Sequence, residues 1–294
     1  MRIAFIGFGE AARAFQATLA AHDPSLRFAA YDLLLDDPAA APAMRASIAE
    51  RNVARAASPA GLADADWIVS AVTADQSLAV VEALAPHLRQ GHVLIDINSV
   101  SPGRKRASAA LVEAARATYL DMAVMAPVHP RGHRTPTLVA GPAAAALGDE
   151  LKRLDFSFRI VGEAVGAATA IKMVRSLFVK GLEAVTVECL LAAQGSDCFD
   201  EVYGSLARDF SGLGWPHFAA YEFERTLRHG KRRAAEMRES AATIAELGLN
   251  GALAAEIAEV QERMGRAGAA PPRADALAEG IAAVVRARLA GSVP

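Results

Sequence analysis

Short, largely apolar runs alternate with longer amphipathic stretches along the first half of the chain. Residues 2–6, 67–72 and 93–97 are apolar at nearly every position, a pattern typical of parallel strands that are buried on both faces. Helical spacing of apolar positions fills the intervals, for example over residues 10–21 and 105–118. This alternation predicts an α/β fold with a doubly wound parallel sheet.

The pattern of apolar positions changes near residue 162, and after this point it is helical throughout. Further strands are expected at residues 28–31, 53–56, 119–123, 138–140 and 158–161. Helices are expected at residues 164–193, 200–211, 215–229, 232–246, 250–267 and 275–289. Glycines and prolines separate several of these helices. We therefore expect an α/β domain over residues 1–162 and an all-α domain over residues 163–294.

The composition is that of a folded globular protein. Of the 294 residues, 53% are hydrophobic and 22% are charged, so global disorder is excluded. The net charge of −2 argues against nucleic acid as the main partner. Cys189 and Cys198 are too few for a disulfide scaffold, and they suit a reducing, cytoplasmic compartment. No apolar run reaches the roughly 18 residues of a membrane span, so no membrane association is expected.

A glycine-containing turn follows the first predicted strand. The pattern G-x-G-x-x-G/A is matched by Gly7, Phe8, Gly9, Glu10, Ala11 and Ala12. Between a strand and a helix, this pattern is typical of a Rossmann dinucleotide-binding turn. Gly7 permits the tight turn, Gly9 lets the backbone approach the pyrophosphate, and Ala12 is small enough for close packing. The alternative is an ordinary strand–turn–helix whose glycines serve geometry alone.

Asp32 stands at the end of the second predicted strand. An acid at this place hydrogen-bonds the adenosine ribose and repels a 2′-phosphate. Residues 33–35 are all leucines and offer no arginine to bind such a phosphate. NAD is therefore the expected cofactor, although Arg45 or Arg51 could fold back and admit NADP.

The motif order of the chain resembles that of the β-hydroxyacid dehydrogenase and 6-phosphogluconate dehydrogenase superfamily. The resemblance covers nearly the whole chain, and the helical part is similar to a less characterised branch. Residues 96–102, with the sequence DINSVSP, resemble the superfamily's D-x-S-T-x-x-P element. The resemblance implies that Asn98 and Ser99 face the substrate and nicotinamide, and that Val72 and Thr73 line the nicotinamide side. Capping of the next helix is an alternative role for Asn98 and Ser99, and both roles can coexist.

The superfamily's substrate loop, D-x-P-V-S-G-G, aligns with residues 121–127, where Met-Ala-Pro replaces Ser-Gly-Gly. The replacement begins at Met125 and removes the hydroxyl that usually holds a substrate carboxylate. We expect Arg131, His133 or Arg134 to supply the anion contact through charge-assisted hydrogen bonds. A solvated basic loop is the alternative. Proline and glycine interrupt the spacing of the two histidines in this loop, so no metal site is expected.

Residues 162–172 resemble the superfamily's G-x-x-G-x-G-x-x-x-K signature, in which Lys172 takes the position of the catalytic lysine. The resemblance implies that Lys172 is the general acid/base, and burial beside nicotinamide would lower its pKa as a base requires. Ser176, one turn later, replaces the superfamily's asparagine and can still hydrogen-bond a substrate. The resemblance also implies that a cation of the basic cluster, Lys231 or Arg232, reaches the cofactor. Arg–Glu pairing on a solvated helix face is the alternative for that cluster.

These features predict an NAD-dependent oxidoreductase that transfers a hydride between nicotinamide and a small, anionic hydroxy acid such as a sugar acid. If the oxidised product is a β-keto acid, decarboxylation can follow. Two other functions stay open, namely an imine or ketone reductase of the same fold and a protein that binds NAD without turnover. Long apolar helices in the second domain also predict a homodimer.

Overall fold

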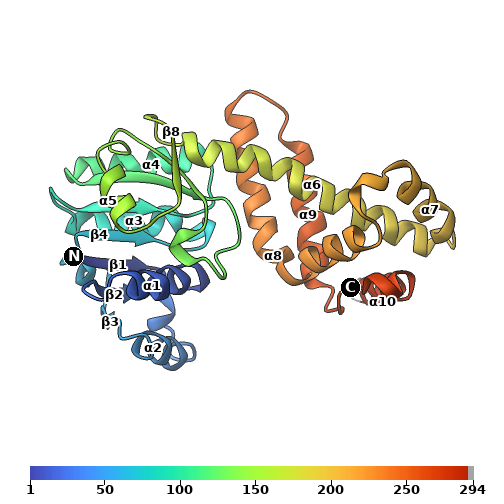
Figure 1. The fold of residues 1–294 in the computed structure, drawn as a ribbon, viewed down its shortest axis with the longest axis horizontal. Coiled ribbons are helices and arrows are strands. Elements are labelled where there is room, and N and C mark those ends of the chain that lie inside the picture. Colours follow the sequence, from blue (N-terminus) through green and yellow to red (C-terminus); the bar gives the residue numbers. More distant parts are fainter. Residues whose placement is uncertain (291–294) are drawn as a thin grey trace. The chain divides into compact units, whose positions relative to one another are not determined.

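The computed structural model describes residues 1–290. The chain forms two compact units, Met1–Lys172 and Met173–Pro294. The first unit contains the sheet and the second is helical (Figure 1). The division falls after residue 172, within a long helix, whereas the sequence predicts a boundary after residue 162.

One sheet of eight strands organises the first unit, in the order β3-β2-β1-β4-β5-β6-β7-β8. The strands are β1 (Arg2–Ile6), β2 (Arg27–Tyr31), β3 (Ala54–Arg55), β4 (Trp67–Ser70), β5 (Val93–Asp96), β6 (Thr118–Val124), β7 (Thr137–Ala140) and β8 (Phe158–Gly162). All neighbouring pairs are parallel except β6 and β7. The predicted doubly wound sheet is confirmed, with one antiparallel pair. An antiparallel pair needs no crossover helix, and a loop suffices to connect β6 to β7.

The helices of the first unit connect and cover the strands. They are α1 (Glu10–His22), α2 (Ala41–Ala49), α3 (Ser77–Leu84), α4 (Pro102–Ala114) and α5 (Gly148–Arg153). The core lies between sheet and helices, where Ile3, Phe5, Phe15 and Ile68 are almost completely buried. The apolar runs are thus buried strands, as the sequence predicts. The short helix α5 was not predicted.

The second unit contains α6 (Ala167–Gly195), which begins in the first unit, followed by α7 (Phe199–Asp209), α8 (His217–Glu246), α9 (Ala252–Arg266) and α10 (Leu277–Ala290). The predicted division of α8 into two helices near Gly230 is wrong. A Cβ on Gly230 would lie 2.2 Å from the carbonyl oxygen of Gln261, and one on Gly265 would lie 2.6 Å from the nitrogen of Lys231. These glycines let α8 and α9 pack closely, and that packing outweighs the roughly 1 kcal/mol that a glycine costs inside a helix.

Across residues 1–290, none of the helices has the length and apolar character of a membrane span. Within the same residues, no three or more histidine, cysteine, aspartate or glutamate side chains are grouped so that they could hold a metal ion.

Candidate active site

The turn between β1 and α1 has the shape of an anion cradle. Gly7 has a φ of +84°, and a Cβ there would lie 2.4 Å from the carbonyl oxygen of Ala71. Only glycine therefore fits at this point, where the turn contacts the end of β4. Gly9 is the N-cap of α1 without a side-chain cap, and a Cβ on it would meet nothing within 4 Å. The first amides of α1 thus border open space, which fits a pyrophosphate at a helix N-terminus.

The other residues of the glycine turn divide between core and surface. The side chains of Phe8 and Ala12 are completely buried, which brings α1 close to the sheet. Ala11 is half-buried and Glu10 is exposed. The negative charge of Glu10 therefore lies in solvent at the start of α1.

Asp32 connects the end of β2 to this turn. Its carboxylate accepts hydrogen bonds from the backbone N–H groups of Phe8, at 2.7 Å, and Leu34, at 2.9 Å. Asp32 is half-buried, so its charge stays at the carboxyl edge of the sheet. In a Rossmann fold, the adenosine ribose binds at this position.

The ends of β4 and β5 are joined by the side-chain amide of Asn98. Asn98 Oδ1 accepts a hydrogen bond from Val72 N–H at 2.7 Å, and Asn98 Nδ2 donates one to Ser70 Oγ at 2.9 Å. Asn98 is buried, and both ends of its amide are engaged by protein groups. It therefore orients the loop after β5, and its direct contact with substrate stays a prediction. Thr73 lies beside Val72 and is the N-cap of the short 3-10 turn before α3.

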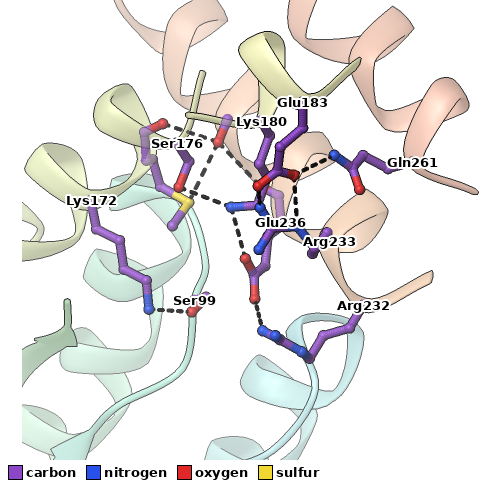
Figure 2. Close-up of polar contacts among 11 residues, drawn as sticks. Ser99, Lys172, Ser176, Lys180, Glu183, Arg232, Arg233, Glu236 and Gln261 are labelled. Carbon is purple, nitrogen blue, oxygen red and sulfur yellow. Dashed lines mark hydrogen bonds and ion pairs between the residues drawn. The ribbon is translucent and has the colours of Figure 1, made fainter. Parts of the chain in front are cut away.

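Lys172 and Ser99 meet at this edge of the sheet. Lys172 Nζ donates a hydrogen bond to Ser99 Oγ at 2.6 Å (Figure 2). Ser99 follows β5, Lys172 lies in the second turn of α6, and both side chains are half-buried. An amine and a hydroxyl at hydrogen-bonding distance and partly accessible can transfer a proton to or from a bound molecule.

A fully buried polar cluster lies beneath the Ser99 loop. Its members are Asp96, Lys105, Tyr119 and Asp121. Burial raises the pKa of Asp121 above its ordinary value, and the neighbouring Lys105 ammonium opposes this rise. Burial, reinforced by the Asp96 carboxylate, also raises the pKa of Tyr119. No role was predicted for Lys105, which lies between Arg104 and Arg106 in the sequence.

His133 corrects one substrate prediction. The loop that carries it packs on α1, since a Cβ on Gly132 would lie 2.1 Å from Thr18 Oγ1. His133 is completely buried, with Nδ1 2.7 Å from Thr18 Oγ1 and its ring packed edge-on against Phe156. Burial lowers the pKa of His133 to about 4. His133 is therefore a neutral packing residue at pH 7 and does not supply a cationic anion contact.

The other predicted substrate residues lie around the same loop. Arg134 forms an ion pair with Asp155 at 2.6 Å, and both side chains are about half exposed. Arg131 is exposed. Met125 is half-buried, and its backbone N–H donates to the carbonyl oxygen of Pro136 at 2.9 Å. Of the predicted cations, Arg131 and Arg134 keep an accessible charge.

Ser176 and Lys231 belong to the second unit. Ser176 is buried and its Oγ accepts a hydrogen bond from Lys180 Nζ at 3.1 Å. Lys180 also pairs with Glu236 at 2.9 Å (Figure 2), and burial lowers the pKa of Lys180. Lys231 is exposed on α8. The next residue, Arg232, pairs with Glu236 four positions later, as the alternative of Arg–Glu pairing expects.

A second buried ion pair lies within the helical unit. Arg233 donates two hydrogen bonds to the carboxylate of Glu183, and Gln261 Nε2 donates to Glu183 at 2.8 Å (Figure 2). These contacts join α6, α8 and α9. In the basic cluster of the sequence, Lys231 is therefore exposed, Arg232 is exposed and paired with Glu236, and Arg233 is buried and paired with Glu183.

Two parts of the chain match known protein families. Residues 2–149 match the family described as the NAD binding domain of 6-phosphogluconate dehydrogenase. Residues 193–264 match a domain of unknown function, DUF1932. Among curated proteins, an uncharacterized 28.5 kDa protein of Methanothermus fervidus is 25% identical over 139 residues. That match covers 47% of this chain and 52% of the relative, so the chain spans about half the length of this curated relative.

Solved structures share the fold over most of the chain. A conserved hypothetical protein from Sinorhizobium meliloti is 36% identical, with a TM-score of 0.75 over 98% of this chain and 96% of its own. The 3-hydroxyisobutyrate dehydrogenase of Mycobacterium tuberculosis is 18% identical, with a TM-score of 0.69 over 97% and 98%. An imine reductase from Myxococcus stipitatus, in complex with NAD+, is 18% identical, with a TM-score of 0.57 over 91% and 94%. The fold is therefore that of hydroxyacid dehydrogenases, and imine reductases share it.

Proposed function

Because this chain belongs to the family of the 6-phosphogluconate dehydrogenase NAD-binding domain, we propose that it is an NAD-dependent dehydrogenase of a small anionic hydroxy acid. The observation that carries the proposal is the 2.6 Å hydrogen bond between Lys172 Nζ and Ser99 Oγ. It combines an amine and a hydroxyl at the carboxyl edge of the sheet, where open α/β folds bind their ligands.

The residues present fit the cofactor. Gly7 and Gly9 form a turn that a pyrophosphate can approach, and the N-terminus of α1 offers its first amides. Asp32 presents a carboxylate for the ribose hydroxyls and disfavours a 2′-phosphate, which supports NAD over NADP. Val72 and Thr73, after β4, would line the nicotinamide side. When bound, nicotinamide supplies the hydride-transfer chemistry between its ring and the carbinol carbon of the substrate.

Lys172 would move the proton of the reaction. In the oxidation, neutral Lys172 accepts the proton of the substrate hydroxyl, and in the reduction the ammonium returns it. Ser99 Oγ holds Lys172 Nζ in place and can donate its own proton to a substrate oxygen. Asn98 keeps the loop that carries Ser99 in register with the end of β4.

The anionic substrate would be held by exposed cations. Arg131 and Arg134 lie in the loop after Met125, and Arg134 would have to exchange Asp155 for the substrate. A guanidinium binds a carboxylate through two parallel hydrogen bonds. Ser176 and Lys231 stay predicted contacts to the substrate and the cofactor.

The direct test is reduced-cofactor formation from NAD across a panel of aldonates, threonate-like acids and phosphorylated sugar acids. We expect one class of acid to be oxidised and Lys172→Met to lose about two to four orders of magnitude in kcat, the usual contribution of a general acid/base. The matched control is Lys152→Met, because Lys152 is an exposed lysine of the same unit, 70% accessible. Equal rates for Lys172→Met and wild type would refute the assigned role.

A second candidate function is reduction of an imine or ketone. The Met-Ala-Pro sequence at residues 125–127 lacks the hydroxyl that usually holds a carboxylate, and imine reductases share the fold. Oxidation of NADH with cyclic imines, without turnover of any acid, would favour this function. Tight NADH binding without turnover of either substrate class would instead support an NAD-binding protein.

We also propose that the protein acts as a homodimer. Ile171, Val174, Phe178 and Val185 are exposed apolar residues on α6, and Phe178 is 73% accessible. Their spacing places them along one stripe of the helix. A second copy of this chain is the proposed partner of that stripe.

A further inference from the structure

The Lys105 ammonium is completely buried between two carboxylates. Lys105 Nζ lies 2.6 Å from the backbone oxygen of Asp96, 2.9 Å from Asp96 Oδ1 and 3.5 Å from Asp121 Oδ1. The two oxygens of Asp96 lie at hydrogen-bonding distance from the ammonium, and the contact with Asp121 Oδ1 is a longer ion pair. A buried lysine is costly unless it is paired in this way.

Each of the two carboxylates also accepts hydrogen bonds from a different segment of the candidate site. Asp96 Oδ1 also accepts a hydrogen bond from Asn98 N–H at 2.9 Å, which shapes the loop that carries Ser99. Asp121 Oδ2 accepts from the N–H groups of Gly166, at 3.1 Å, and Thr169, at 3.2 Å. Asp121 thereby caps the N-terminus of α6, and its charge is favourable there because of the helix dipole.

A direct hydrogen bond also joins the loop after β5 to the first turn of α6. Thr169 Oγ1 donates to the carbonyl oxygen of Val100 at 2.6 Å. Thr169 is completely buried and lies in the first turn of α6, and Val100 follows Ser99. Lys105 therefore joins the two segments through its two carboxylates, and Thr169 joins them without charge.

The cluster does not need to be ionic for stability. A buried ion pair contributes little net stability relative to packed apolar side chains, and such pairs are retained in some proteins for structural specificity. Here the specificity concerns the loop after β5 and the start of α6, which are far apart in sequence. These two segments carry Ser99 and Lys172, whose Oγ and Nζ atoms lie 2.6 Å apart.

We propose that Lys105 is a positioning residue that fixes Lys172 against Ser99 by holding Asp96 and Asp121 together. Lys105 itself touches no substrate. For catalysis, this inference rests on the proposed function of Lys172, whereas its structural content can be tested without a substrate.

The test measures the accessibility of Lys172 in the folded protein. The chain has only five lysines, so amine acetylation by an N-hydroxysuccinimide ester can be followed residue by residue with mass spectrometry. The rate at Lys172 is divided by that at exposed Lys152. In Lys105→Met we expect this ratio to rise about three- to tenfold, the equivalent of one lost hydrogen bond.

Further variants serve as the control, as a second disruption with its rescue, and as a substitute for Lys105→Met. Ser108→Ala alters another buried position of α4 and should leave the ratio unchanged. Thr169→Val should raise the ratio, and Thr169→Ser, which keeps the hydroxyl, should restore it. If Lys105→Met does not fold, Asp121→Asn takes its place, because it keeps the volume and weakens the contact with Lys105.

The outcomes separate positioning from a general structural role. In the positioning role, kcat falls in Lys105→Met while NADH affinity, measured by fluorescence, stays within about twofold of wild type, because the glycine turn is not part of the cluster. An unchanged Lys172 ratio in folded Lys105→Met or its substitute overturns the inference. Failure of wild type to oxidise any acid overturns the proposed function alone, since the labelling needs no substrate.

Discussion

The carboxylate of Asp32 accepts a hydrogen bond from the backbone N–H of Phe8 at 2.7 Å. The end of β2 thus holds the glycine turn after β1, although the two residues are separated by a complete helix. The same carboxylate binds the N–H of Leu34. One acidic side chain therefore shapes the turn and places negative charge where an adenosine ribose would lie.

Replacement of Asp32 by asparagine is expected to weaken NADH binding about ten- to a hundredfold and to reduce the preference for NAD over NADP. Asparagine keeps the shape but loses a charge-assisted hydrogen bond, worth about 1.5–3 kcal/mol, and no longer repels a 2′-phosphate. Fluorescence titrations with NADH and NADPH measure both effects. Asp37→Asn, an exposed change in the following loop, should alter neither affinity, and equal losses in both variants would contradict the assignment.

The two glycines of the turn should respond differently to alanine. Gly7→Ala is expected to lower the free energy of unfolding by about 1–3 kcal/mol, because its positive φ and the contact with Ala71 exclude a side chain. Gly9→Ala should fold normally, since its φ of −78° suits any residue and the space is open, but it should lose NADH affinity. Urea unfolding and NADH titration of both variants test this difference. Normal NADH binding by Gly9→Ala would refute the placement of the pyrophosphate.

Stability should depend on pH through Glu222. Burial raises the pKa of Glu222 from 4.5 to about 7, and its side chain is only 6% exposed. Between these values the folded state keeps a proton that the unfolded state has lost. The free energy of unfolding therefore falls as pH rises through this window.

Glu222→Gln is expected to remove that loss. The free energy of unfolding of the variant should exceed that of wild type by about 1–3 kcal/mol near pH 8 and by little near pH 5, since glutamine does not titrate. Urea unfolding at the two pH values measures the difference. The change Glu224→Gln, at a half-buried position of the same helix that pairs with Arg228, serves as the control for charge alone. An equal gain at both pH values would show that titration of Glu222 is not responsible.

The apolar stripe of α6 predicts a change of assembly on substitution. Phe178→Glu places a charge at the most accessible apolar residue of the stripe, and burial of that charge in an interface is costly. We expect the variant to be monomeric in sedimentation velocity, with unchanged unfolding of the monomer. Leu253→Glu, at an exposed position of α9, should leave the assembly unchanged. A wild-type monomer at all concentrations would contradict the proposed dimer.

Local pattern was sufficient for much of the fold and for part of the site. The strands, the glycine turn and most helices follow from apolar spacing and from glycine, which are properties of adjacent residues. Lys172 and Ser99 were each singled out by motif, and the structure brings them together. The break assigned at Gly230 was wrong, because a glycine that ends a helix and one that lets two helices cross look the same in sequence.

The sequence by itself determined the order of elements and the glycine turn, since short-range sterics and burial dictate these features, and the family resemblance singled out Lys172 on its helix. Only the tertiary structure decided that His133 is a neutral packing residue and that Lys105 lies between Asp96 and Asp121. The physical reason is that charge state and hydrogen-bond partners depend on burial and on residues from distant segments. No local pattern distinguishes a solvated basic helix face from an ammonium enclosed beneath the candidate site.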